Sequence, residues 1–308
     1  MGTQPKNDLV AVIDLGSNSC LLLIARQTGH GLEPVKEVLR VVRLGAGVDE
    51  SGLLSQLAMD RSEAVFSEYR QIIEQHGCTR VRCVATSAFR DAANRDELRQ
   101  RLLETVGYDL RALDGDEEAS LVMKAVLDAF PAQVDSRWIV DVGGGSTEIV
   151  VERGGEMTAT VSMGLGSVRH TERWLRSDPP EMEELLVMHA DILAQLLDIE
   201  EFEPPRQMVG VGGTATTFVA LEKHLDTYNH QQVHGSQLSG ESLQISLDRC
   251  LAANLEERRT FAGLHPDRAE IIIAGGSILL AVLEKAGLDQ MTVSDRGLRW
   301  GVAAEMAG

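Results

Sequence analysis

Two short stretches of this chain are near copies of each other, and each places an aspartate before glycines and hydroxyl side chains. They are residues 12–24, Val-Ile-Asp-Leu-Gly-Ser-Asn-Ser-Cys-Leu-Leu-Leu-Ile, and residues 139–151, Ile-Val-Asp-Val-Gly-Gly-Gly-Ser-Thr-Glu-Ile-Val-Val. Each pattern predicts a strand, a tight turn and a second strand, with Asp14 or Asp141 where the first strand ends. Turn amides suit a phosphate, and the carboxylate suits a Mg²⁺ that bridges to it. We therefore expect two domains that clamp a phosphate chain, and phosphoryl chemistry is the leading hypothesis.

The second copy carries the sharper signal. Gly143, Gly144 and Gly145 follow one another and are succeeded by two hydroxyls and Glu148. A hairpin needs one or two glycines, and each further glycine costs conformational entropy. The extra ones make sense where a ligand approaches the backbone closely. The first copy is weaker alone, because Asn18 and its neighbouring serines are common turn formers.

Two further glycine pairs are predicted to join a strand to a helix. A strand at 207–211 precedes Gly-Gly-Thr-Ala-Thr-Thr at 212–217, and a strand at 271–274 precedes Gly-Gly-Ser at 275–277. Helix N-termini bind anions through free N–H groups and the helix dipole. Ordinary helix capping explains the same residues. The sequence leaves both readings open.

An acidic helix start and two arginines complete the candidate residues. In Asp-Gly-Asp-Glu-Glu-Ala, residues 114–119, the acids complement the dipole of a helix N-terminus, or one of them serves as a general base. Spacing does not choose between Glu117 and Glu118. Arg90 and Arg268 suit a bidentate grip on phosphate, and each also suits an ion pair at the surface.

The order of expected elements predicts an α/β fold. The 308 residues are 44% hydrophobic but only 4% aromatic, which favours α/β layers over an all-β sandwich. Strands and helices alternate in both halves, and the repeated hairpin indicates a duplication. No Walker-type loop occurs, which disfavours a P-loop NTPase.

Charge and cysteine usage exclude several classes of protein. The net charge of −18 disfavours nucleic acid and anionic membranes as partners. Cys20, Cys78, Cys83 and Cys250 lack the spacing of a zinc site or disulfide framework. Residues 1–8 lack a signal-peptide apolar region, and no apolar run reaches the length of a membrane span. We expect a cytoplasmic protein.

Taken together, these motifs resemble the exopolyphosphatase and guanosine pentaphosphate phosphatase family. The resemblance runs from about residue 9 to 302 and rests on the two hairpins, on Ala-Thr-Ser-Ala-Phe-Arg at 85–90, on Gly-Gly-Thr at 212–214 and on Ser-Asp-Arg-Gly-Leu-Arg at 294–299. It implies two ribonuclease-H-like domains of the actin, Hsp70 and sugar-kinase superfold flanking a cleft. The expected domains are 1–120 with a C-terminal helix at 296–308, and 121–295. The chain resembles the short, two-domain form.

The resemblance also implies roles for individual residues. Glu118 would activate water, and Glu148 would be a second essential acid near the metal. Asp141, Asp14 and Glu148 would hold Mg²⁺, and Mn²⁺ suits the same oxygen ligands. The residues that would bind phosphate are Asn18, Ser19, Arg90, Gly143, Gly144, Gly145, Ser146 and Arg268.

The implied function is that of a hydrolase acting on phosphoric anhydride bonds. The first hypothesis is an exopolyphosphatase that releases phosphate from the ends of inorganic polyphosphate. One alternative is hydrolysis of the 5′-phosphate of guanosine pentaphosphate, and another is a non-catalytic sensor of polyphosphate or alarmone. A sugar-type kinase is disfavoured, because Glu148 suits water activation better than a hydroxyl acceptor. The resemblance also suggests a homodimer, for which the sequence offers no pattern of its own.

Overall fold

The computed structural model of the chain describes residues 8–131 and 134–308, which form two compact units. Unit 1 runs up to Leu121 and includes Leu298–Gly308, and unit 2 is Val122–Gly297. The division falls within one helix. Residues 1–7, which cover most of the segment where no signal peptide is expected, lie outside the described residues. The division into domains 1–120 with 296–308 and 121–295 stays a prediction.

Unit 1 is built on a five-stranded mixed sheet of order β3-β2-β1-β4-β5. The first three strands are antiparallel neighbours, whereas β1, β4 and β5 run parallel. The strands are β1 (Leu9–Leu15), β2 (Ser19–Thr28), β3 (Gly31–Val41), β4 (Arg80–Ala85) and β5 (Leu110–Ala112). The helices are α1 (Val48–Ser51), α2 (Gln56–Gln75), α3 (Ser87–Asp91), α4 (Arg95–Val106), α5 (Gly115–Ala129), which continues into unit 2, and α13 (Leu298–Ala307).

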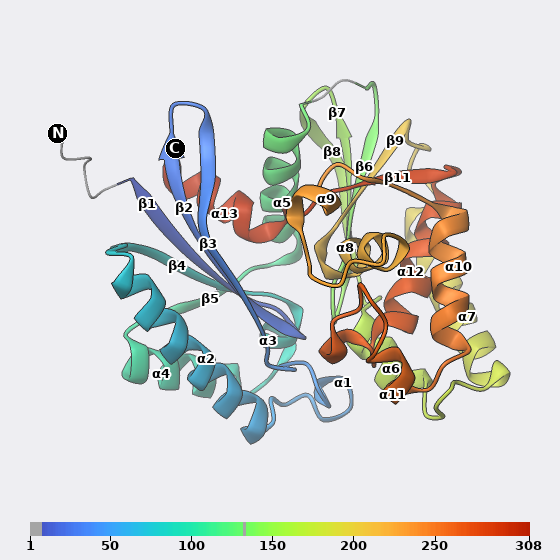
Figure 1. Cartoon of the computed structure of the whole chain (residues 1–308), viewed down its shortest axis with the longest axis horizontal. Helices are drawn as coiled ribbons and strands as arrows, with labels where there is room; N and C mark the ends of the chain where they lie inside the picture. The colour runs from blue at the N-terminus through green and yellow to red at the C-terminus, as the bar shows by residue number, and fades with distance from the viewer. Residues whose placement is uncertain (1–7, 132–133) are drawn as a thin grey trace. The chain divides into compact units, whose positions relative to one another are not determined.

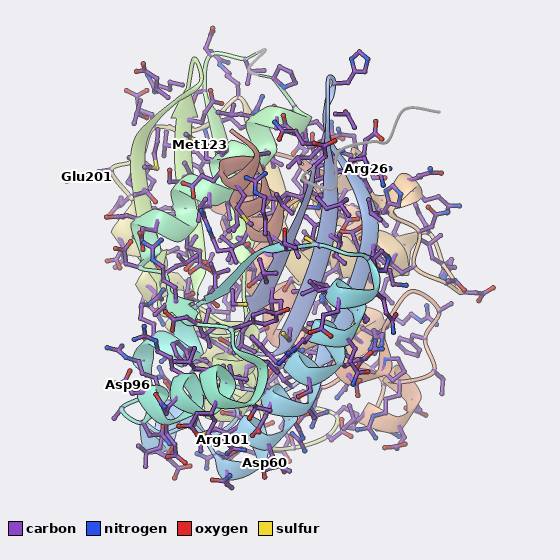
Figure 2. All side chains as sticks on the ribbon, turned by 90° about the vertical axis from the view of Figure 1, so that its left-hand side faces the viewer. Arg26, Asp60, Asp96, Arg101, Met123 and Glu201 are labelled. Atoms are coloured by element: carbon purple, nitrogen blue, oxygen red, sulfur yellow. The ribbon has the colours of Figure 1, made fainter. Side chains whose placement is uncertain are left out.

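Both faces of this sheet are buried, and alternation along β1 shows how. Ala11, Ile13 and Leu15 join the core that α2 and α4 complete. Because successive side chains of a strand point to opposite faces, Asp14 points to the other face. Helix α13 packs against β1 and β2 (Figure 1). At the outer surface, α2 and α4 are joined by an ion pair of 2.7 Å between Asp60 and Arg101. Figure 2 labels both residues.

Unit 2 repeats the same plan with one additional edge strand. Its sheet has the order β10-β11-β9-β6-β7-β8, so β11-β9-β6-β7-β8 matches β5-β4-β1-β2-β3 in order and direction. The strands are β6 (Arg137–Val142), β7 (Thr147–Arg153), β8 (Glu156–Met163), β9 (Gln207–Val211), β10 (Gln237–Ser239) and β11 (Gln290–Val293). The predicted α/β fold with two ribonuclease-H-like units is confirmed.

The helices of unit 2 enclose a core built on one face of its sheet, to which β6 contributes Trp138, Val140 and Val142. They are α6 (Ser167–Trp174), α7 (Met182–Gln195), η1 (Leu196–Ile199), α8 (Gly212–Glu222), α9 (His230–Val233), α10 (Gly240–Leu251), α11 (Leu255–Arg258), η2 (Pro266–Arg268) and α12 (Ile272–Lys285). Helices α10 and α12 lie side by side (Figure 1).

The predicted strand at 271–274 and the glycine turn after it are wrong. These residues lie in the first turns of α12, and Gly275 and Gly276 are buried inside that helix. A Cβ on Gly276 would stand 2.3 Å from Cζ of Phe218. The glycine therefore serves the close packing of α12 on α8, and residues 275–277 offer no helix N-terminus to an anion.

Asn94 precedes α4, but its side chain makes no capping hydrogen bond. Instead, its amide pairs with the backbone of Leu54, donating at 3.0 Å and accepting at 2.8 Å. Asn94 thus ties the loop before α2 to the start of α4.

Candidate functional site

The two hairpins that the sequence singles out have the same turn geometry. In unit 1, the Gly16 N–H donates to the Ser19 carbonyl at 2.9 Å. In unit 2, the Gly143 N–H donates to the Ser146 carbonyl at the same distance. The strand registers also agree: Asp14 stands opposite Leu21 in unit 1, and Asp141 stands opposite Glu148 in unit 2. The sequence repeat is therefore a structural repeat.

The glycine loop of unit 2 turns its carbonyl groups toward α6. The Gly143 carbonyl accepts from the Ser167 N–H at 2.9 Å, and the Gly144 carbonyl accepts from the Val168 N–H at 2.8 Å. The Gly145 carbonyl accepts from Nε of Arg169 at 2.8 Å. These bonds satisfy the first amides of α6, which would otherwise lack partners.

The same bonds fix the direction of the loop amides. In a planar trans peptide the N–H lies opposite the preceding C=O. The amides of Gly144, Gly145 and Ser146 therefore point away from α6. Within residues 8–131 and 134–308, they donate to no protein acceptor. Successive amides directed to one side form a concave binding site for an anion.

The turn of unit 1 is held in a similar way from the segment after β3. The Ser17 carbonyl accepts from the Gly45 N–H at 2.7 Å, and the Asn18 carbonyl accepts from the amides of Val42 and Arg43 at 3.0 and 2.9 Å. The amides of Asn18 and Ser19 consequently point to the opposite side. This turn offers two such amides where unit 2 offers three.

Two carboxylates of unit 2 lie on one face of its sheet, beside the glycine loop. Asp141 and Glu148 are directly opposite each other on β6 and β7. Directly opposed residues share a face, with Cβ atoms about 5 Å apart. Glu148 is only 2% exposed and accepts a hydrogen bond from Oγ of Ser162 at 2.8 Å. Two like charges this close favour a proton or a cation between them.

The turn between β9 and α8 brings Asp141 near Arg268. Gly212 has φ 78°, and a Cβ there would stand 2.2 Å from Oδ1 of Asp141. A Cβ on the next residue, Gly213, would stand 1.8 Å from Nη1 of Arg268. The glycine pair thus leaves room for a carboxylate on one side and a guanidinium on the other. Arg268 also contacts Oγ1 of Thr217 at 3.4 Å.

The structure separates the roles of the two adjacent glutamates at the start of α5. Glu117 forms a capping arrangement, in which its amide donates to Oδ1 of Asp114 at 2.8 Å and its carboxylate accepts from the Asp114 amide at 3.3 Å. Its carboxylate also pairs with Arg111. Glu118 is buried, at 6% exposure. Glu117 is accounted for by capping, whereas Glu118 is not.

Glu118 shares its surroundings with Arg90. Nη1 of Arg90 stands 3.5 Å from Oε2 of Glu118 and donates to the Leu113 carbonyl at 2.9 Å. A weaker ion pair of 3.8 Å joins Arg90 to Asp91. The guanidinium is therefore held beside the glutamate by the backbone.

Asp14 on β1 of unit 1 matches Asp141 on β6 of unit 2. It is buried at 9% exposure, on the sheet face where α13 packs. Burial raises the pKa of Asp14 to about 6, and the positive charge of Arg299 on α13 partly opposes this rise. The cost of burying the carboxylate therefore exceeds what the charge of Arg299 offsets. A bound cation would supply further compensating charge.

Sequence reasoning missed the residues that hold the glycine loop of unit 2. A Cβ on Gly166 would stand 2.3 Å from the Gly144 carbonyl oxygen. Gly166 has φ −137° and ψ 145°, so it is needed for space and not for its conformation. The segment Gly-Leu-Gly-Ser-Val-Arg at 164–169 was a visible signal, since it pairs glycines with an arginine.

Among the described residues, no three or more His, Cys, Asp or Glu side chains form a group able to hold a metal ion. In the same residues, no helix combines the length and apolar character needed to cross a bilayer.

With this geometry established, comparisons with known proteins place the chain. The model of the Ppx/GppA phosphatase family matches residues 23–308. Exopolyphosphatase 2 of Mycobacterium tuberculosis is 36% identical over 317 residues, which cover 97% of this chain and 98% of that protein. The chain belongs to the Ppx/GppA phosphatase family.

Two further relatives extend this result. The guanosine-5′-triphosphate,3′-diphosphate pyrophosphatase of Vibrio vulnificus is 30% identical over 99% of this chain, which spans 61% of that protein. The crystal structure of the Aquifex aeolicus member of the Ppx/GppA family is 34% identical, covers 96% of both chains and gives a TM-score of 0.81.

Proposed function

We propose that this protein is an exopolyphosphatase that hydrolyses the terminal phosphate of inorganic polyphosphate. The observation that carries the proposal is the row of amides at Gly144, Gly145 and Ser146, directed away from α6 beside Asp141 and Glu148. The relative from Mycobacterium tuberculosis supports it, because it is named an exopolyphosphatase and matches this chain over nearly its whole length.

The proposed reaction is the attack of water on the terminal phosphate of the chain. Glu118 accepts a proton from water as the water attacks the terminal phosphorus, and the bridging oxygen leaves with the shortened chain. The loop amides donate to the phosphate oxygens, where charge grows in the transition state. Asn18, Ser19, Arg90 and Arg268 hold the polyanion.

The carboxylates suit a hard divalent cation. Asp141 and Glu148 are like charges on one sheet face, and Asp14 is buried without full compensation. Mg²⁺ is bound in proteins by one or two carboxylates, with water and substrate phosphate completing its ligands. We propose that Asp14, Asp141 and Glu148 hold Mg²⁺ or Mn²⁺. When bound, the cation would neutralise charge on the phosphate oxygens.

Phosphate release with Mg²⁺ tests the function. Long-chain polyphosphate, short-chain polyphosphate and guanosine pentaphosphate are compared, each with the wild type and with Glu118→Gln and Glu148→Gln. We expect the wild type to turn over polyphosphate and both substitutions to lower its rate strongly. No release from any substrate, with polyphosphate binding retained, would leave a sensor.

The second candidate is hydrolysis of guanosine pentaphosphate. It is favoured by the relative from Vibrio vulnificus, whose name includes a guanosine substrate. Faster turnover of guanosine pentaphosphate than of any polyphosphate would promote this candidate over the first.

We further propose a homodimer. Large apolar side chains gather on the exposed side of α7 and η1, where Met182, Leu186 and Leu197 are 70%, 62% and 60% exposed. Exposed apolar patches of this kind mark interaction surfaces. Analytical ultracentrifugation of the wild type and of Leu186→Asp tests this, with a dimer expected for the first and a monomer for the second.

We place the protein in the cytoplasm. All four cysteines are buried and unpaired, as in a reducing compartment. Fractionation of cells with an antibody to the protein tests the assignment.

A further inference from the structure

A buried histidine lies directly behind the glycine loop. His170, on α6, is fully buried, and its Nε2 stands 3.0 Å from Oδ2 of Asp191 on α7. Gln195 donates to the same carboxylate oxygen at 2.9 Å. At the other side of the ring, Nδ1 stands 3.3 Å from the Gly166 amide nitrogen and 3.2 Å from the Gly166 carbonyl oxygen.

These contacts determine which ring nitrogen carries the proton. An ionised carboxylate only accepts hydrogen bonds, so Nε2 of His170 must donate to Asp191. Burial lowers the pKa of His170 and keeps the ring neutral. In a neutral ring protonated at Nε2, Nδ1 is an acceptor, and it therefore receives the Gly166 N–H. No other acceptor for that N–H occurs in the described part of the chain.

Gly166 links this pair to the phosphate-binding loop. It is the residue immediately before α6, and its backbone lies against Gly144 and Gly145. The next three amides of the helix, at Ser167, Val168 and Arg169, hold the carbonyls of Gly143 and Gly144. Any shift of Gly166 would move the α6 amides that hold the loop carbonyls. The direction of the loop's own amides would change with them.

We propose that His170, oriented by Asp191, is a positioning residue that fixes Gly166 and thereby aims the amides of Gly144, Gly145 and Ser146 at the phosphate. The inference rests on the proposed phosphate-binding role of these amides. His170 contacts no substrate itself. Its contribution is to keep the loop in the binding geometry before substrate arrives.

Two substitutions of His170 separate positioning from packing. Leucine fills the space but offers no acceptor to the Gly166 N–H, whereas the Oε1 of glutamine restores one. We expect His170→Leu to raise hydrogen exchange of peptides covering 143–149 and 164–170 about tenfold, and to lower kcat/KM about tenfold. We expect His170→Gln to stay within about threefold of the wild type. His189→Leu, an exposed histidine on α7, is the matched control and should change neither quantity.

The outcomes are distinguishable from failure of the proposed function. Hydrogen exchange requires no turnover, so it decides the inference even if the wild type hydrolyses no polyphosphate. Equal behaviour of the leucine and glutamine variants would overturn the positioning role. So would faster loop exchange in His170→Leu with unchanged kcat/KM in an active enzyme.

A spectroscopic test covers the case in which the variants fail to fold. The ¹⁵N chemical shifts of the His170 ring in the wild-type protein report its tautomer. The inference requires a neutral ring protonated at Nε2 at pH 7. An imidazolium, or a ring protonated at Nδ1, cannot accept from Gly166 and would contradict it.

Discussion

The β1–β2 hairpin of unit 1 and the β6–β7 hairpin of unit 2 share their strand register and their turn hydrogen bond, yet four matched positions differ by more than an exchange of aliphatic side chains. With the residue of unit 1 given first, these pairs are Ser17 and Gly144, Asn18 and Gly145, Cys20 and Thr147, and Leu21 and Glu148. The two hairpins thus share their backbone, but only the hairpin of unit 2 carries a second acid, Glu148.

The difference indicates where each unit obtains its second carboxylate. In unit 2, Glu148 faces Asp141 across the hairpin. In unit 1, the equivalent of Glu148 is Leu21, and the buried acid is Glu118 on α5 instead. The hairpin of unit 2 thus carries two acids and that of unit 1 carries one, and we propose that Glu118 on α5 supplies the second acid of unit 1.

The largest effect is expected at Glu118. Glu118→Gln should lower kcat by about a thousandfold, because general-base catalysis contributes factors of about 10² to 10⁴. Glu117→Gln is the matched control and should lower kcat less than about threefold, since Glu117 is explained by capping. Steady-state phosphate release measures both. Equal losses would contradict the separation of the two glutamates into a base, Glu118, and a helix cap, Glu117.

Glu148→Gln should lower kcat about a hundredfold and leave polyphosphate binding nearly intact. Leu21→Gln, at the matched position of unit 1, should keep kcat within about threefold, because leucine there has no chemical role. Rates and polyphosphate affinities of both variants give the comparison. A greater loss in Leu21→Gln would reverse the assigned roles of the two hairpins.

Gly166→Ala should lower kcat/KM about a hundredfold, because its Cβ would overlap the Gly144 carbonyl and displace the loop amides by about 1 Å. Gly45→Ala, which meets Ser17 at 3.1 Å in unit 1, should cost about tenfold or less. Thermal denaturation of both proteins separates misplacement from unfolding. An active Gly166→Ala enzyme would refute the importance of the unit 2 loop.

Arg268→Lys should raise KM for short-chain polyphosphate about tenfold, because a lysine loses the forked donor pair that matches phosphate oxygens. Arg259→Lys, at the exposed end of α11, is the control. Initial rates over a range of substrate concentrations measure the effect. An unchanged KM would restrict phosphate binding in unit 2 to the backbone amides.

The smallest effect is expected at Cys20. Cys20→Ala should leave kcat within about twofold and lower the free energy of unfolding by about 1 kcal/mol. Burial raises the pKa of this thiol well above its usual range, so no thiolate is available for catalysis. Kinetics and urea denaturation check both expectations. A large loss of activity would show that Cys20 has a chemical role in the unit 1 hairpin.

The hairpins could be predicted from sequence because local rules agree there. Alternating apolar residues, an aspartate at the strand end and a glycine turn all indicate the same structure. The prediction for residues 271–277 was wrong although the local pattern was clear. An apolar run followed by two glycines is typical of a strand and a turn. Packing of Gly276 against Phe218 overrode that local preference.

The contacts that support the glycine loop of unit 2 could not be predicted from the sequence. That Gly166 approaches Gly144, and that His170 joins it to Asp191, depends on how β8 returns the chain to the glycine loop. The choice between Glu117 and Glu118 likewise needed burial and hydrogen bonds, because both stand in the same acidic run.

The most direct test of the proposed function is ³¹P NMR of polyphosphate hydrolysis in ¹⁸O-enriched water with Mg²⁺. The account predicts that inorganic phosphate accumulates with one ¹⁸O atom, that the number of chain ends stays constant, and that Glu118→Gln abolishes the reaction. Label found in the shortened chain, new chain ends from internal cleavage, or no phosphate release by the wild type would contradict it.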